Sequence, residues 1–145
     1  MRLTRAGEYA IRCLLYLSQH RDRPIISRKE IAEAMDIPAQ FLGKVAQQLA
    51  RAGLIAIRQG AHGGYELVAA PEDITLLSVV ESIDGEIFLN DCIHRPDSCD
   101  RQAFCSVHLV WERARRQLRD TLAGTTLARL VEEEGHGCAN RSPGP

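Results

Sequence analysis

Hydrophobic residues recur every three or four positions through the first part of the chain, which is the spacing of one face of an α-helix. The run 5–19 carries such a face, and Thr4 before it is a typical N-cap. The stretch SRKE at 27–30 is a capping-box signature that opens a short second helix. A third helix is predicted from Pro38 to Gly53, because proline favours a first turn and glycine follows a last one. Its apolar positions are Phe41, Leu42, Val45 and Leu49.

After the third helix the period changes from that of a helix to that of a strand. Residues 54–58 and 65–68 alternate like two strands, and the connection QGAHGG at 59–64 holds three glycines that permit a tight hairpin. The two preceding helices alone would equally fit a plain helical hairpin, but a hairpin directly after them is the outline of a wing. We therefore predict a winged helix-turn-helix DNA-binding domain over residues 1–70, and a chain that is mostly α with a small β-hairpin.

The second half of the chain is predicted to be helical, with a polar loop in the middle. Thr75 caps a small amphipathic helix that Gly85 closes, and the loop follows from Leu89 to about residue 102. Beyond the loop lies a long helix with an apolar stripe that fits a partner helix, as in a coiled coil, or an intramolecular packing face. The residues of this predicted seam are Val107, Trp111, Ala114, Leu118 and Leu122.

The end of the chain is predicted to hold one more helix and a tail. Thr125 is the expected cap of a short helix through Val131, and residues 135–145 resemble a disordered tail. Residues 71–134 would then form a second region, made of the loop and the helices around it.

Composition and charge narrow the class of protein. The chain of 145 residues is 45% hydrophobic and 26% charged, as expected for a globular protein with a core. It opens with no signal-peptide pattern, so we expect a cytoplasmic protein with no membrane partner, in which thiols stay reduced. Residues 1–65 carry ten Lys and Arg against five Asp and Glu, whereas residues 66–145 carry eight against fourteen. The basic half suits DNA phosphates, although a chance imbalance would look the same.

Three of the five cysteines lie between positions 92 and 105, and His108 follows three residues after the last of them. Cys92, Cys99 and Cys105 are spaced C-x6-C-x5-C, and His108 follows at a distance that places it on the same side of a helix as Cys105. Thiolates are soft ligands that favour iron–sulfur clusters and zinc. The gaps are wider than those of familiar structural zinc sites, which favours a cluster over a Cys3His zinc site. Free thiols acting as a redox switch are the third alternative. Cys13 and Cys138 are assigned no role.

Several stretches together resemble the IscR/NsrR type of bacterial winged-helix regulators, the Rrf2 family. The resemblance covers almost the whole chain and is carried by MRLTRAGEYAIRCLLYL, ISRKEIAEAMDIPAQFLGKVAQQLARAGLI, RQGAHGGYEL, TTLARLVEE and the cysteine loop with its His and Trp. It implies a homodimer on a two-fold symmetric double-stranded DNA operator. It also implies a long helix as the dimer interface and an iron–sulfur cluster as the sensor.

The resemblance offers two candidates for the fourth ligand beside the three cysteines. His108 matches the histidine of IscR-like members that hold a 2Fe–2S cluster. Glu8 matches the carboxylate that nitric-oxide-sensing members donate to the 4Fe–4S cluster of the partner subunit. The first gap between cysteines has six residues, where the closest IscR pattern has five. We favour His108 and a 2Fe–2S cluster, because histidine in place of a thiolate raises the reduction potential, which suits a sensor.

The resemblance also assigns the DNA contacts. Bases are read in the family by early residues of the third helix, which match Gln40, Gly43 and Lys44, and by the wing. Gln59 stands where relatives have an arginine for the minor groove, and the adjacent Arg58 is its candidate substitute. Side chains that match phosphate contacts are Thr4, Arg5, Tyr9, Arg28, Arg51 and His62.

These observations predict a transcriptional regulator whose affinity for its operator is controlled by the state of an iron–sulfur cluster. The cluster would sense redox state, iron–sulfur status or nitric oxide. One alternative is the same fold without a cluster, regulated by a protein partner or by thiol oxidation. Another is a thiol-dependent redox enzyme, but no triad-like or cofactor-loop pattern accompanies the cysteines.

Overall fold

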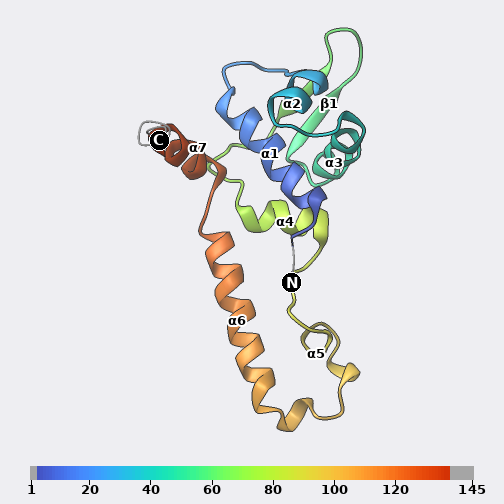
Figure 1. Ribbon diagram of the computed structural model, residues 1–145, viewed down its shortest axis with the longest axis vertical. Coiled ribbons are helices and arrows are strands. Elements are labelled where there is room, and N and C mark those ends of the chain that lie inside the picture. Colours follow the sequence, from blue (N-terminus) through green and yellow to red (C-terminus); the bar gives the residue numbers. More distant parts are fainter. Residues whose placement is uncertain (1–2, 138–145) are drawn as a thin grey trace, which may run out of the picture.

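Helices dominate the described part of the chain, where one two-stranded antiparallel sheet accompanies them (Figure 1). The structure, a computed structural model, describes residues 3–137. In chain order the elements are α1 (Arg5–Gln19), α2 (Arg28–Ala34), α3 (Ala39–Arg51), β1 (Ile55–Arg58), β2 (Gly64–Leu67), α4 (Leu76–Asp84), α5 (Asp91–His94), the short 3-10 helices η1 (Pro96–Ser98) and η2 (Gln102–Phe104), α6 (Ser106–Ala123) and α7 (Leu127–Gly137). The predicted fold class, mostly α with a β-hairpin wing, is confirmed.

The predicted caps of α1, α2 and α4 are present. The side-chain oxygens of Thr4, Ser27 and Thr75 each accept a hydrogen bond from the backbone N–H three residues later, at 3.1–3.2 Å. These bonds satisfy donors that a helix leaves unpaired in its first turn, which is why each helix begins where it does.

The last helix differs from the prediction at both ends. The cap is Thr126 rather than Thr125, because the Thr126 hydroxyl accepts from the backbone of Arg129 at 3.2 Å. The Thr125 hydroxyl instead donates to the carbonyl of Thr121 at 3.0 Å. The helix also runs on to Gly137 instead of ending near Val131, so the first residues of the predicted tail are helical. The rest of that tail lies outside the described residues.

The hydrophobic core lies around α1, which packs against α3, α4 and α7 (Figure 1). Cys13 belongs to this core, and its burial raises the pKa of the thiol to about 12, which leaves it protonated and inert. The largest fully buried side chains are Leu14, Ile26, Ile31, Leu42, Leu49, Ile74, Leu127, Val45, Val79 and Cys13.

The turn between α2 and α3 is built as a tight corner. Asp36 has a positive φ of 53°, a conformation that aspartate tolerates better than most residues, and Ile37 after it is buried. The Ile37 amide donates to the carbonyl of Ala32 at 2.9 Å. From α1, the Arg12 guanidinium donates to the carbonyls of Met35 at 3.3 Å and Asp36 at 3.5 Å. The first helix therefore holds the helix-turn-helix corner in place.

The wing is a hairpin of β1 and β2 with a third segment beside it. Ile26, just before α2, forms an isolated antiparallel bridge with Tyr65, through hydrogen bonds of 2.8 and 3.0 Å. A Cβ at Gly64 would lie 2.2 Å from the carbonyl oxygen of Ile26, and one at Gly63 would lie 2.2 Å from that of Arg58. The two adjacent glycines are thus required by close backbone approach, which anchors the hairpin to the helices.

The long helix α6 and the loop before it project away from the winged-helix region (Figure 1). None of the residues of α6 is buried. In the predicted seam, Ala114, Leu118 and Leu122 are half-buried, whereas Val107 and Trp111 are exposed. Among the described helices, none combines the length and the hydropathy that crossing a membrane requires.

Two arginines fasten α6 to α4 and to the segment that follows α4. The Arg115 guanidinium donates to the carbonyl of Ile87 at 2.7 Å and pairs with Glu86. One turn later, Arg119 pairs with Glu81 of α4. Because α4 packs against both α1 and α3, these pairs join the projecting helix to the winged-helix region.

Candidate nucleic-acid interface and cysteine loop

A groove of about 630 Å³ lies between α3 and the wing. Its position between a recognition helix and a hairpin is the one at which winged helix-turn-helix proteins meet DNA. The groove brings together six of the predicted DNA contacts, and it adds Gln47, Ile57 and Tyr65, which the sequence did not single out. The six predicted residues are Arg28, Gln40, Gly43, Lys44, Arg58 and Gln59.

Cationic side chains reach this groove from α2, α3 and β1, and they differ in whether the charged group is already paired with a carboxylate. A Cβ at Gly43 would lie 3.0 Å from Nη1 of Arg28, so the glycine leaves room for the Arg28 guanidinium beside α3. Arg58 of β1 is paired with Glu66 of β2, with its Nε and Nη2 atoms 2.8 and 2.7 Å from Oε2. Lys44 pairs with no carboxylate within residues 3–137, and its ammonium lies 6.0 Å from the centre of the Phe41 ring.

The remaining predicted phosphate contacts lie outside the groove. His62 is exposed in the loop of the wing, and Arg51 is exposed at the far end of α3. The Thr4 hydroxyl accepts from the backbone as a cap and donates its only O–H to the Asp84 carboxylate, so that donor is already used. Arg5 and Tyr9 line a second hollow of about 420 Å³, together with Glu8, Arg12, Asp36, Ile37 and Pro38.

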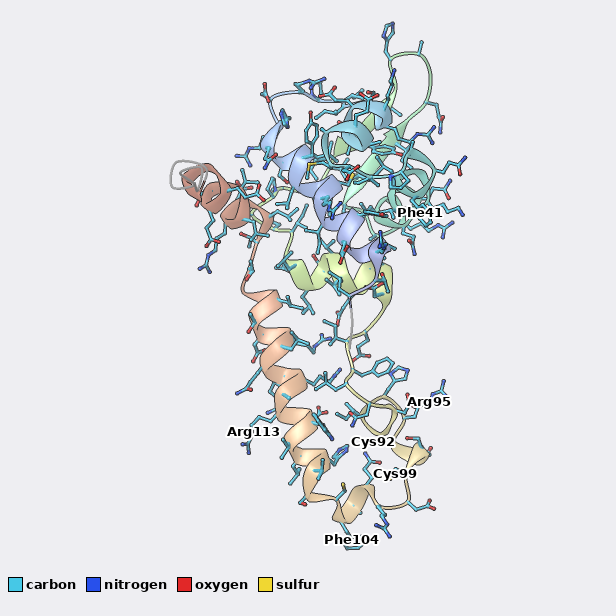
Figure 2. All side chains as sticks on the ribbon, in the orientation of Figure 1. Phe41, Cys92, Arg95, Cys99, Phe104 and Arg113 are labelled. Atoms are coloured by element: carbon cyan, nitrogen blue, oxygen red, sulfur yellow. The ribbon has the colours of Figure 1, made fainter. Side chains whose placement is uncertain are left out.

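The cysteine loop is built from short turns. Cys92 lies in α5, Cys99 directly follows η1, and Cys105 directly follows η2 and precedes α6. Three backbone hydrogen bonds of 3.2–3.4 Å connect this segment. The amide of Gln102 donates to the carbonyl of Cys99, that of Cys105 to Gln102, and that of His108 to Cys105. Figure 2 shows Cys92 and Cys99 on the loop beside α6, at the end of the molecule far from the wing.

The donor set of this loop fits a cluster or a metal in its chemistry. Cys92, Cys99 and Cys105 are free and half-buried. The Nδ1 atom of His108 is buried and has no hydrogen-bond partner among the described residues. A buried polar atom without a partner costs about 1–3 kcal/mol, so a ligand for it would be stabilising. Within residues 3–137, however, no three His, Cys, Asp or Glu side chains lie close enough together to hold a metal ion.

Glu8, the other predicted ligand, is exposed on α1 and belongs to the second hollow. Its neighbours in that hollow are Arg5 and Arg12 rather than any cysteine of the same chain. Within one chain the structure therefore places Glu8 in a hollow near the helix-turn-helix corner that two arginines and Asp36 also line.

The helix-turn-helix, the wing and the groove between them define a winged-helix DNA-binding protein. Residues 3–133 match the family model Rrf2, described as an iron-dependent transcriptional regulator, and the chain belongs to this family. Its relatives are transcriptional regulators, not enzymes.

Two relatives show the extent of the similarity. Protein rrf2 of Nitratidesulfovibrio vulgaris is 32% identical over 133 residues, which cover 92% of this chain and 89% of that protein. The HTH-type transcriptional regulator IscR of Vibrio atlanticus is 29% identical over 133 residues, which cover 92% of this chain and 76% of that protein.

Two solved structures share the fold. The structure of T. potens IscR covers 99% of this chain and 94% of its own, with 24% identity and a TM-score of 0.77. The oxidized form of Staphylococcus aureus CymR covers 91% of this chain and 97% of its own, with 29% identity and a TM-score of 0.70.

Proposed function

We propose that the protein is a dimeric transcriptional regulator whose affinity for a two-fold symmetric operator is controlled by a 2Fe–2S cluster. In this proposal Cys92, Cys99, Cys105 and His108 hold the cluster, while α3 and the wing bind the DNA. The observation that carries the proposal is the Nδ1 atom of His108, in the first turn of α6 and three residues after Cys105. It is buried and has no hydrogen-bond partner within the described part of the chain.

The DNA side of the proposal rests on the groove between α3 and the wing. Gln40 can pair with an adenine through two hydrogen bonds, and Lys44 can reach a guanine or a phosphate. Arg28 and Arg58 supply charge for phosphates on either side. Because Gly43 carries no side chain, Arg28 takes the space beside α3 and contributes to the contacts there.

The dimer rests on the exposed apolar residues of α6. Val107, Val110 and Trp111 share one face of α6, at positions i, i+3 and i+4, and are between 40% and 56% exposed. Leu109 is 69% exposed and lies to the side of that face. Such an apolar patch on a helix that projects into solvent is typical of a protein–protein interface. We propose that α6 of a second copy covers it, which places the two cysteine loops beside the dimer axis.

A bound cluster would supply a group that changes charge and ligation with redox state or nitric oxide. His108 would tie that group to the start of α6, while farther along α6 Arg119 pairs with Glu81 of α4 and Arg115 bonds to the segment after α4. A displacement of the helix start would pass through α4 to α3 and change the distance between the two recognition helices of the dimer. A tenfold to hundredfold change in operator affinity, about 1.4–2.8 kcal/mol, is the usual size of such coupling.

Single replacements test the ligand set on anaerobically purified protein. We expect the visible spectrum to be abolished by Cys92→Ala, Cys99→Ala and Cys105→Ala. His108→Ala should shift or weaken the spectrum, and it should reduce the difference in operator affinity between the forms with and without the cluster. Cys13→Ala is the matched control, because Cys13 is a buried core residue, and its spectrum should be unchanged. If Glu8→Ala strips the cluster and His108→Ala keeps it, a 4Fe–4S cluster with a carboxylate from the partner subunit is the correct arrangement.

A second candidate function is regulation by thiol oxidation without a cluster. It is favoured by the half-exposed, free cysteines and by the lack of a gathered ligand set among residues 3–137. One similar structure is the oxidized form of a regulator. In that case purified protein would be colourless, and peroxide would change operator affinity in a way that a thiol reductant reverses and that Cys99→Ala abolishes.

A further inference from the structure

One large apolar side chain on the DNA-facing helix is exposed instead of buried. Phe41 is the third residue of α3, and its side chain is 54% exposed. Figure 2 shows it on the side of the winged-helix region, away from the cysteine loop. The other apolar residues predicted for α3, Leu42, Val45 and Leu49, are at most 2% exposed. Phe41 is therefore the one member of that apolar pattern that does not serve the core.

The Phe41 ring is held in place by two neighbours. Its edge packs against the ring of Tyr9, a core residue of α1, with the ring centres 6.2 Å apart and the planes at 61°. The ammonium of Lys44 lies 6.0 Å from the ring centre. An edge-to-face aromatic contact and a cation over a ring both favour one orientation. The ring is thus presented to solvent in a fixed position instead of folding onto the surface.

The position of Phe41 on the helix places it beside residues of the groove. Lys44 follows Phe41 by three residues and Gln40 by four, so the three side chains lie on one continuous side of α3. They also lie in the first half of the helix, the part of a recognition helix that reaches base edges. Gln40 and Lys44 carry hydrogen-bonding groups, but Phe41 can recognise only an apolar surface.

We propose that Phe41 determines operator specificity by contacting the 5-methyl group of a thymine in the major groove. Among the groups that base pairs display in the major groove, this methyl is the apolar one, and phenylalanine is a side chain suited to it. The inference deepens the proposed DNA-binding function and rests on it, because it requires that α3 enters the major groove.

The test uses the full chain and DNA selected by it. Duplexes that bind are selected from a random library, and each thymine of the preferred sequence is then replaced singly by deoxyuracil, which lacks only the methyl group. We expect one thymine in each half-site at which this replacement weakens binding about fourfold, the factor that burial of one such group contributes. At that position Phe41→Ala should bind the thymine and deoxyuracil duplexes equally, and Phe41→Leu should keep part of the difference.

The controls separate this inference from the function on which it rests. Circular dichroism and thermal melting establish whether each variant is folded. If Phe41→Ala is unfolded, the deoxyuracil replacements with the wild-type protein and with Phe41→Leu decide the question. If Lys44→Ala weakens binding but no thymine responds to loss of its methyl, the Phe41 inference is wrong and the DNA interface stands. If Phe41→Ala weakens every duplex equally, Phe41 only supports α3. If no sequence is preferred, or Lys44→Ala has no effect, the proposed interface itself is wrong.

Discussion

Gly64→Ala should detach the wing from the helices that carry it. The Cβ of alanine would lie 2.2 Å from the carbonyl oxygen of Ile26 and 2.6 Å from its carbonyl carbon. Both are backbone atoms, which cannot rotate away as the end of a side chain can. The bridge between Ile26 and Tyr65 must therefore open, and its two hydrogen bonds of 2.8 and 3.0 Å would be lost.

The expected loss of stability follows from those bonds and their burial. Ile26 is 1% exposed and Tyr65 is 4% exposed, so water does not readily replace the lost partners. Two backbone hydrogen bonds contribute about 2 kcal/mol in total, and groups left unsatisfied in a buried place raise the cost to about 3–4 kcal/mol. For a chain of this length such a loss lowers the melting temperature by roughly 6–16 °C.

Thermal unfolding and DNA binding measured together test this reasoning. The matched control is Gly53→Ala, because Gly53 has a φ of +75° but nothing lies within 4 Å of the place that an alanine methyl would take, so only backbone strain of about 1–2 kcal/mol is expected. Gly64→Ala should also weaken DNA binding below its melting temperature, because the wing carries Arg58 and Gln59. Equal melting temperatures for the two variants, or a Gly64→Ala protein that melts like the wild type, would refute the close-approach argument.

Three further predictions concern the DNA interface, the ion pair between α4 and α6, and the stability of the protein at acidic pH. Lys44→Ala should weaken operator binding on the order of tenfold without changing the visible spectrum, whereas Arg51→Ala, outside the groove, should have a smaller effect in the same titration. A double-mutant cycle of Arg119→Ala and Glu81→Ala should give a coupling energy of about 1 kcal/mol in urea unfolding, since the pair is about one-quarter exposed, and additive effects would exclude a stabilising contact. Hydrogen bonds from Arg23 and Tyr16 lower the pKa of Glu30 from 4.5 to about 2, so its contribution to stability is complete above pH 4.5 and is lost as the pH falls towards 2. Glu30→Gln should flatten the stability profile in that window, and an unchanged profile would contradict the assignment.

Local signals made much of the fold predictable from the sequence. The caps Thr4, Ser27 and Thr75 act on residues within one turn, so a short stretch of sequence contains the whole interaction. The choice between the adjacent Thr125 and Thr126 could not be made in this way, because both residues have the same chemistry. Only the structure shows that Thr126 caps α7 while Thr125 bonds back to the preceding helix.

Contacts between distant residues were not predictable. The bridge from Ile26 to Tyr65 and the bonds from Arg12 to the helix-turn-helix corner join residues that no spacing rule connects. Periodicity also placed Phe41 with the core residues of α3, because a hydrophobic pattern records side-chain type and not exposure. On α6 the predicted seam omitted Leu109 and Val110, which are more exposed than Val107 and Trp111, its two exposed members.

The cysteine loop is the part of the site that sequence and fold define least. The sequence identified four donors, and the structure adds that one of them, the Nδ1 atom of His108, is buried without a partner. The geometry of the ligands depends on the bound group, because the free energy of metal binding contributes to the folding of the segments that carry the ligands. The proposal that a cluster controls DNA binding therefore rests on a chemical measurement of the protein.

The most direct measurement is the visible absorption spectrum of anaerobically purified protein, combined with assays for iron, acid-labile sulfide and zinc. We predict a coloured protein with iron and sulfide in near-equal amounts, and loss of the colour when Cys92, Cys99 or Cys105 is replaced by alanine. A colourless protein with stoichiometric zinc, or with no metal and a redox-active thiol, would contradict the cluster as the sensor.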